Sequence, residues 1–244
     1  MVKKCVFIAL YMMAGWAVAQ QDNSVNESYT LTTSETIKPF AASYVVRKLG
    51  MKAEINTSIS IDGDRYIYTK NTKPKGMAKL FLKEATETSV FTHQDGKLGL
   101  IEYAYAMQSK DEKRNENFSF DKSLKRVVGN SRGNDFSLEV EENLMDRASM
   151  EIALMMDAGK RTDLDYRIVD RGRIKDYKFT YEGQQSIKAA GEKYNCDMYK
   201  VSRSSGKRST SMCLAEALGF LPIMVIHDEN GTELKMLLTK QNLQ

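Results

Sequence analysis

The chain has 244 residues, of which 42% are hydrophobic and 28% charged, and its formal net charge is +4 at pH 7. Its basic residues are scattered among acidic and apolar ones, which argues against the basic surface that nucleic-acid binding needs. With two histidines and three cysteines, the sequence lacks the ligand set of a structural zinc site. We therefore expect neither a nucleic-acid partner nor a metal.

The first 19 residues have the three parts of a secretory signal peptide. A basic start at residues 3–4 precedes an apolar stretch over residues 5–16, and small residues follow at Ala17 and Ala19. A membrane-spanning helix would need about 20 apolar residues, and this run ends at Gln20. We expect cleavage between Ala19 and Gln20, export through the general secretory route, and no transmembrane anchor.

Cleavage would change the composition of the remaining chain. It would remove Lys3 and Lys4, which leaves 34 Lys and Arg against 32 Asp and Glu. It would also remove Cys5 and the only tryptophan, Trp16. The exported chain would then be nearly neutral and would keep two cysteines.

Those two cysteines, Cys196 and Cys213, predict a disulfide, because an oxidising compartment favours pairing. Residues 197–203 and 208–214 read as the arms of a hairpin. If Arg203 pairs with Arg208, Cys213 lies opposite Met198 and diagonal to Cys196, and a small bulge would bring the sulfurs within reach. Two buried free thiols are the alternative.

Period-two alternation of apolar and polar residues dominates from Phe40 onward and predicts strands with one buried face. Residues 20–38 are polar and are expected to form a flexible leader, while residues 39–240 are expected to form one β-rich domain. Asp-Gly at 62–63 and 95–96 and Asn-Gly at 230–231 predict tight turns. The expected strands are 42–47, 51–61, 65–72, 89–94, 97–107, 117–120, 124–128, 135–140, 164–169, 174–181, 185–189, 197–203, 208–214, 222–227 and 233–239.

Residues 146–158 depart from this pattern and predict a helix, with Asp146 as N-cap and Gly159 just after the end. A strand is the alternative, because Met150, Ile152 and Leu154 also alternate. About a dozen strands in one domain must curl into a barrel or half-barrel, or split into a sandwich. We expect a large curved antiparallel sheet, with the helix packed on its concave face.

No catalytic motif is present in the sequence. His93 and His227 each precede a predicted turn, where solvated side chains are common. Asp62-Gly63-Asp64 could suggest a calcium loop but lacks further ligands at loop spacing, so a turn is expected there. Asp163 and Asp165 could form an acid pair but read better as surface carboxylates. We expect no catalytic residue, no metal ligand and no cofactor.

Several segments in order resemble the domain of unknown function 3108 family. They include Asp62-Gly63-Asp64-Arg65-Tyr66-x-Tyr68 with Lys75-Gly76-Met77-Ala78, then Glu87-Thr88-Ser89-Val90-Phe91 with Asp95-Gly96, and Tyr103-Ala104-Tyr105. Residues 166–177, which read YRIVDRGRIKDY, are the most specific stretch, and residues 218–223 continue the resemblance. Lys122 stands where the family has an aromatic residue after Phe-Asp. The resemblance runs from about residue 40 to 239.

This resemblance implies an exported protein of Gram-negative bacteria without an established activity. It implies an architecture similar to the open half-barrel of periplasmic lipoprotein carriers, with a helix in the concavity. Such a likeness concerns the fold and does not transfer function.

Two non-catalytic functions fit these expectations. The first is a periplasmic carrier for an apolar ligand such as a lipid or acyl chain. The second is an envelope structural or protein-interaction factor whose barrel is filled. A hydrolase is the third and least favoured function. The candidate apolar lining of a ligand site is Ile55, Ile59, Ile152, Met155 and Met156.

Overall fold

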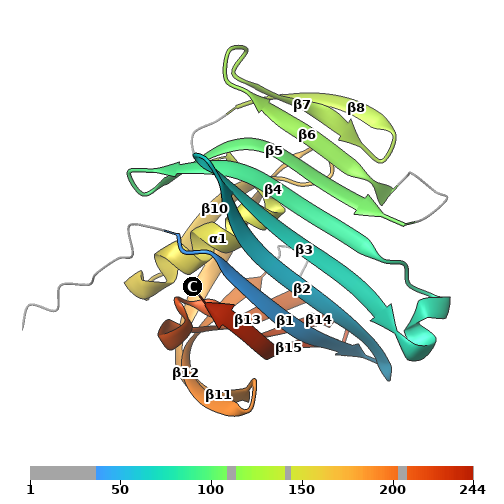
Figure 1. Ribbon diagram of the computed structural model, residues 1–244, viewed down its shortest axis with the longest axis vertical. Helices are drawn as coiled ribbons and strands as arrows, with labels where there is room; N and C mark the ends of the chain where they lie inside the picture. Colours follow the sequence, from blue (N-terminus) through green and yellow to red (C-terminus); the bar gives the residue numbers. More distant parts are fainter. Residues whose placement is uncertain (1–36, 109–113, 141–143, 203–207, 244) are drawn as a thin grey trace, which may run out of the picture. The chain divides into compact units, whose positions relative to one another are not determined.

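The computed structural model describes residues 37–108, 114–140, 144–202 and 208–243. The expected signal peptide, its cleavage point and most of the polar leader lie outside these residues. The described residues form one 15-stranded sheet that does not close, and one α-helix lies in its concavity (Figure 1). The expected fold class, a curved antiparallel sheet with one main helix on the concave face, is confirmed.

The strands in chain order are β1 (Phe40–Lys48), β2 (Met51–Asp62), β3 (Arg65–Lys75), β4 (Ala85–Gln94), β5 (Lys97–Met107), β6 (Glu116–Asp121), β7 (Arg126–Ser131), β8 (Asn134–Glu139), β9 (Leu144–Asp146), β10 (Leu164–Val169), β11 (Ile174–Ala189), β12 (Glu192–Ser202), β13 (Arg208–Ala215), β14 (Leu221–Glu229) and β15 (Thr232–Leu243). The α-helix is α1 (Arg147–Asp157). Three short 3-10 helices are η1 (Gly76–Leu80), η3 (Ala158–Lys160) and η4 (Glu216–Leu218).

Two meanders join in the middle of the sheet. From the centre of the sheet, β1 to β8 follow one another in order to one edge. On the other side, β15 to β9 follow in reverse order to the second edge, and β1 pairs with β15 at the centre. Every pairing is antiparallel except that of β9 with β10, which is parallel. Four register shifts interrupt the pairings. Such bulges add local bending and twist, which helps the sheet to curve.

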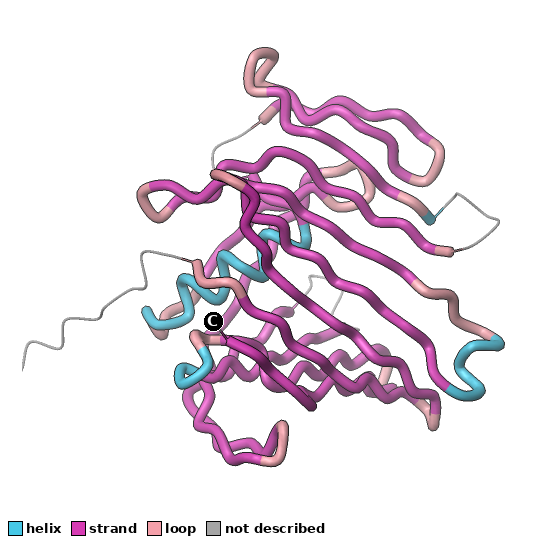
Figure 2. Tube along the Cα trace, in the orientation of Figure 1, coloured by secondary structure: helices cyan, strands magenta, loops and turns pink. Residues whose placement is uncertain are grey.

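The alternation in the sequence sets which face of each strand is buried. In β1, Ala42 and Tyr44 are buried, and in β2, Ala53 and Ile59 are buried, as the pattern predicts. Each Gly-containing turn at 95–96 and 230–231 has positive φ at both residues, which is the backbone of a two-residue hairpin. Figure 2 shows the resulting succession of long strands and short turns.

The predicted helix is present, and its start is fixed by a capping box. Asp146 Oδ1 accepts hydrogen bonds from the backbone N–H groups of Ala148 at 2.8 Å and Ser149 at 2.7 Å. The Ser149 hydroxyl accepts in return from the Asp146 N–H at 3.0 Å. Gly159 follows the C-cap residue Ala158, as predicted, but the chain continues through η3 and the left-handed residue is Arg161.

The sheet contains one strand that was not expected and joins two that were expected to be separate, and some bounds are shifted: β7 begins at Arg126 rather than Leu124, and β4 begins at Ala85. Residues 144–146 form β9, which is too short to show alternation. Residues 174–189 form one strand, because the expected break at Gly183 is a register shift between Tyr181 and Gln184 in the pairing with β12. An extra residue in one strand is accommodated as a bulge without ending the ladder.

The two free edges, β8 and β9, are linked directly by the chain. From Glu139 to Leu144 there are five peptide steps, so those two ends lie within about 18 Å of each other. Across this gap the Gly172 N–H donates to Glu116 Oε1 at 3.1 Å. A Cβ on Gly172 would lie 3.2 Å from the ring of Phe136. Side-chain and turn contacts therefore bridge the edges where strand pairing is missing.

Candidate functional site

The start of α1 is anchored to the concave face by a buried carboxylate. Asp146 is fully buried, and its Oδ2 accepts a hydrogen bond of 2.7 Å from the Ser89 hydroxyl on β4. Burial raises the pKa of Asp146 to about 6, although hydrogen bonds from Ser149 and Ser89 act in the opposite direction. The charge of Glu87 nearby adds to the increase.

Arg147, the first residue of α1, contacts charged and aromatic side chains on the same concave face. Its Nε lies 3.3 Å from Glu87 Oε1, and its Nη1 lies 3.6 Å from Asp170 Oδ1. The guanidinium lies 5.2 Å from the ring centroid of Tyr105, within cation–π range. It also donates to the Tyr103 hydroxyl, which itself donates to Glu87 Oε1 at 2.6 Å. These contacts tie the helix to β4, β5 and the loop after β10.

One turn further along α1, Glu151 binds β3. Glu151 Oε2 accepts a hydrogen bond of 2.9 Å from the Tyr68 hydroxyl, and Oε1 accepts one from Lys70. Burial alone would lower the pKa of Lys70, but the carboxylates of Glu151 and Glu87 outweigh it and the pKa is raised. The N-terminal half of α1 is therefore fixed by paired charges.

The C-terminal end of α1 is fixed as well. The Tyr199 hydroxyl donates to the Ala158 carbonyl at 2.8 Å, and the Tyr166 hydroxyl donates to Asp157 Oδ2 at 2.9 Å. Just beyond the helix, Arg161 Nε donates to Asp197 Oδ2 on β12 at 3.0 Å. A helix held at both ends provides a wall of fixed position.

Between the C-terminal half of this helix and strands β5 and β6 lies a pocket of about 560 Å³. This volume falls in the range of small-molecule sites, about 300–1,000 Å³. The pocket is next to the gap between the two sheet edges, because β9 forms part of its wall. Its apolar lining consists of Leu98, Leu100, Phe120, Val140, Leu144, Met145, Ala153, Met156 and Tyr166.

The charged residues at the pocket divide into two groups. Lys97, Lys122 and Lys125 are exposed, come from the β4–β5 and β6–β7 turns, and have no ion pair within the described part of the chain. Two of the carboxylates are already bound: Asp157 pairs with Lys160 at 2.5 Å, and Asp121 accepts hydrogen bonds inside its own turn. The Ser123 hydroxyl and the backbone N–H of Leu124 lower the pKa of Asp121. The third carboxylate, Asp165, is exposed and has no ion pair among the described residues, so the rim presents three unpaired cations against one unpaired carboxylate.

Of the five residues expected to line a ligand site, the structure places only Met156 in this pocket. Ile59 and Ile152 are buried in the apolar core, and Ile55 and Met155 pack against that core. The three lysines and Phe120 were not predicted from the sequence as site residues. The sequence predicted the Asp95-Gly96 turn. That this turn lies beside the β6–β7 turn depends on strand pairing, which the sequence does not show.

The two histidines occupy separate strands. The ring of His93 packs edge-on against Tyr66 at a centroid distance of 6.1 Å, and partial burial lowers its pKa. His227 Nδ1 lies 2.8 Å from the Thr210 hydroxyl. Asp163 accepts from the Tyr181 N–H at 3.1 Å, whereas Asp165 lines the pocket.

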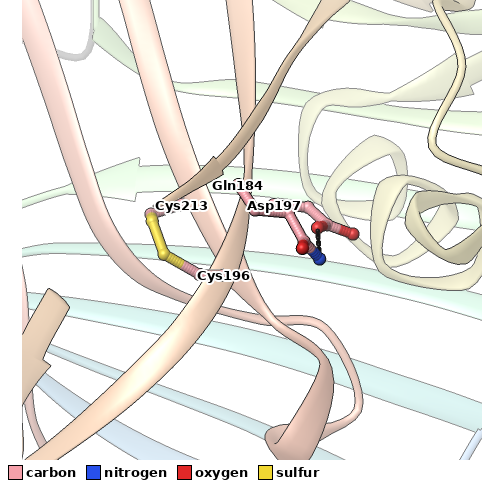
Figure 3. The surroundings of a disulfide bond; sticks show 4 residues. All are labelled: Gln184, Cys196, Asp197 and Cys213. Atoms are coloured by element: carbon pink, nitrogen blue, oxygen red, sulfur yellow. Dashed lines mark hydrogen bonds between the residues drawn. A yellow bond between two sulfur atoms is a disulfide. The ribbon is translucent and has the colours of Figure 1, made fainter. Parts of the chain in front are cut away.

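Cys196 and Cys213 form a disulfide that links β12 and β13, with a Cα–Cα distance of 5.4 Å. Met198 pairs with Cys213, which confirms the predicted register. A register shift follows Cys213 in its pairing with β14. Figure 3 shows Cys196 and Asp197 on opposite sides of β12. Of these two adjacent residues, Cys196 forms the disulfide and Asp197 binds Arg161 just beyond the helix end.

Comparison with known proteins agrees with this architecture. The family model described as "Protein of unknown function (DUF3108)" matches residues 36–239. No curated protein matches the chain. A solved structure titled "Crystal Structure of Beta-barrel-like Protein of Domain of Unknown Function DUF1849 from Brucella abortus" is similar in fold, with a TM-score of 0.59 at 10% identity. It covers 85% of this chain and 98% of its own. The chain therefore belongs to the DUF3108 family of proteins of unknown function.

Proposed function

We propose that this protein is exported to the periplasm and there binds an amphiphile without catalysing a reaction on it. The hydrocarbon chain of the amphiphile would occupy the pocket beside α1, and its anionic head would lie against the rim lysines. The observation that carries the proposal is the apolar pocket of about 560 Å³ at the gap in the sheet.

The chemistry of the lining supports this ligand class. Transfer of each CH₂ group from water into an apolar site contributes about 0.8 kcal/mol, and the inner wall consists largely of Leu, Phe, Val and Met side chains. Methionine adapts to irregular apolar shapes, which suits a flexible chain. Because α1 is held at both ends, the pocket requires little rearrangement before binding.

Export is supported by two features of the chain. The first 19 residues have the composition of a signal peptide. The Cys196–Cys213 disulfide is of a kind that persists in oxidising compartments. The intact mass of protein purified from the periplasm tests this part of the proposal. A chain beginning at Gln20 is expected, and a cytoplasmic protein that retains Met1 would refute it.

Binding can be tested with an environment-sensitive fluorescent fatty acid and the purified full-length mature protein. Saturable binding is expected, and Met156→Trp should weaken it about tenfold or more by filling the pocket. Met155→Trp is the matched control, because Met155 is its helix neighbour but lies outside the pocket lining. Thermal melts of both variants show whether each still folds.

The charged part of the site can be tested without altering the interior. Replacement of Lys97, Lys122 and Lys125 by Gln removes three exposed cations, so the fold should be unaffected. Affinity for the fatty acid should fall about tenfold, and affinity for an uncharged analogue should not change. Lys188→Gln with Lys193→Gln is the control on exposed positions of β11 and β12. No saturable binding to the unaltered protein would refute the proposed function.

A further inference from the structure

A second surface of the molecule carries apolar side chains that no other part of the described chain covers. It is the β3–β4 tip, which we define as residues 76–83 and which contains η1 (Figure 2, cyan, lower right). Four of its side chains are largely exposed: Met77 (76%), Leu80 (73%), Phe81 (72%) and Leu82 (45%). Adjacent exposed apolar residues of this kind mark an interaction site.

This tip has a defined backbone. Ala78 is buried, and its carbonyl accepts hydrogen bonds from the N–H groups of Phe81 at 3.1 Å and Leu82 at 2.8 Å. The small side chain of Ala78 points inward, so the larger ones around it point outward. The exposure of the apolar side chains therefore follows from the local fold.

The surroundings of the tip are basic. Lys52 on β2 pairs with Lys75 on β3, which places the β1–β2 turn at the same end of the sheet. Residues 47–54 and 73–84 contain seven Lys and Arg against two Glu. Lys75 pairs with Glu54 at 2.8 Å, whereas Lys79 and Lys83 are exposed and have no ion pair within the described residues. Leu49 in the β1–β2 turn adds a further exposed apolar side chain (78%).

We propose that the β3–β4 tip docks this protein on an anionic lipid surface. Within the described residues, exposed apolar side chains next to the unpaired Lys79 and Lys83 match the two parts of such a surface, the acyl boundary and the negative headgroups. A stable protein interface buries about 800 Å² per partner, and a turn of eight residues is small for that purpose. Shallow insertion into a bilayer requires no such area.

The tip and the pocket are independent features. The tip precedes β4, and the pocket residues Gly96 and Lys97 follow it. A ten-residue strand spans about 33 Å. Changes at the tip should therefore leave fatty-acid binding unchanged, and Met156→Trp should leave lipid docking unchanged. This inference does not rest on the proposed ligand.

Co-sedimentation of the full-length mature protein with vesicles tests the proposal. Vesicles of phosphatidylcholine containing one quarter phosphatidylglycerol should bind the protein, and pure phosphatidylcholine vesicles should bind it weakly. Lys79→Gln with Lys83→Gln should lower partitioning about thirtyfold, as expected for two cations near an anionic surface. Leu80→Ser with Phe81→Ser should lower it at least about tenfold through lost apolar insertion.

Ile61→Ser is the matched control, because Ile61 is an exposed apolar residue (47%) at the other end of β2. It should bind vesicles like the unaltered protein. Equal binding to both kinds of vesicle, or binding that neither double variant weakens, would overturn the proposal. Loss of self-association or of a protein partner in the tip variants, with no vesicle binding by the unaltered protein, would assign the tip to protein recognition instead.

Discussion

Asp146 makes the stability of this fold depend on pH in a direction that is unusual for a carboxylate. The pKa of Asp146 is raised from 3.8 to about 6, and burial is the largest cause. Between about pH 4 and pH 6 the Asp146 carboxyl group is therefore protonated in the folded state, whereas it is ionised in the unfolded state. The unfolding free energy that Asp146 contributes is fully present below pH 4 and is lost as the pH rises through 6, in total about 3 kcal/mol.

Asp146→Asn removes this titration and keeps the shape of the side chain. The Asn oxygen can still accept from the N–H groups of Ala148 and Ser149, and the Ser89 hydroxyl can rotate to accept from the new amide. Between about pH 4 and pH 7 the stability of the variant relative to the unaltered protein should therefore rise by about 3 kcal/mol. Urea unfolding followed by circular dichroism at several pH values in this range measures the difference.

The control is Asp64→Asn, the same substitution at an exposed turn carboxylate outside the helix cap, measured at the same pH values. Asp146→Ala should destabilise the protein across this range, because it removes the helix cap and leaves the Ser89 hydroxyl without its acceptor. If the Asp146→Asn difference is the same at every pH, Asp146 is ionised in the folded protein as readily as in the unfolded one. Burial would then not raise the pKa of Asp146, contrary to the prediction.

Three further changes test other parts of the structure by chemical or thermal unfolding. Replacing Cys196 and Cys213 together by Ala should lower the unfolding free energy by about 3 kcal/mol, because the disulfide closes a loop of moderate length, with a separation of 17 residues. Reduction of the unaltered protein should lower its stability by the same amount, and unchanged stability would contradict the prediction. Arg147→Met should cost about 2–3 kcal/mol, because it removes the cation that lies 3.3 Å from Glu87 and leaves Glu87 only the more distant Lys70, at 3.9 Å; a neutral effect would show that solvent already screens the Arg147–Glu87 pair. Gly129→Ala should lower the melting temperature by several degrees, because the new Cβ would lie 2.1 Å from the Asn117 carbonyl oxygen, and an unchanged melting temperature would show that β6 can move away.

Local sequence predicted the strands because one buried face imposes alternation along each of them. It predicted the helix because residues 146–158 are rich in Ala, Met and Leu and because Asp146 caps its own turn. The register of β12 with β13 also followed from a short hairpin. Each of these features is decided by residues close together in the chain, so each leaves a local pattern.

The pocket left no such pattern. The β6–β7–β8 meander places Phe120 near Val140, but Met156 on α1 joins them from the opposite edge of the sheet, where β9 pairs with β10. The partners of Arg147 likewise come from β4 and from the loop after β10. Charges that face each other across the concavity look like ordinary surface residues in the sequence.

The sequence by itself determined a β-rich chain, its strand order along the polypeptide, one capped helix, a pair of cysteines and the family to which it belongs. The tertiary structure alone decided that the first and last strands pair, that the sheet stays open between β8 and β9, and that α1 leaves a pocket at that gap. The physical reason is that alternation and caps are local. Pairing between distant strands depends on how the whole sheet curves around the helix.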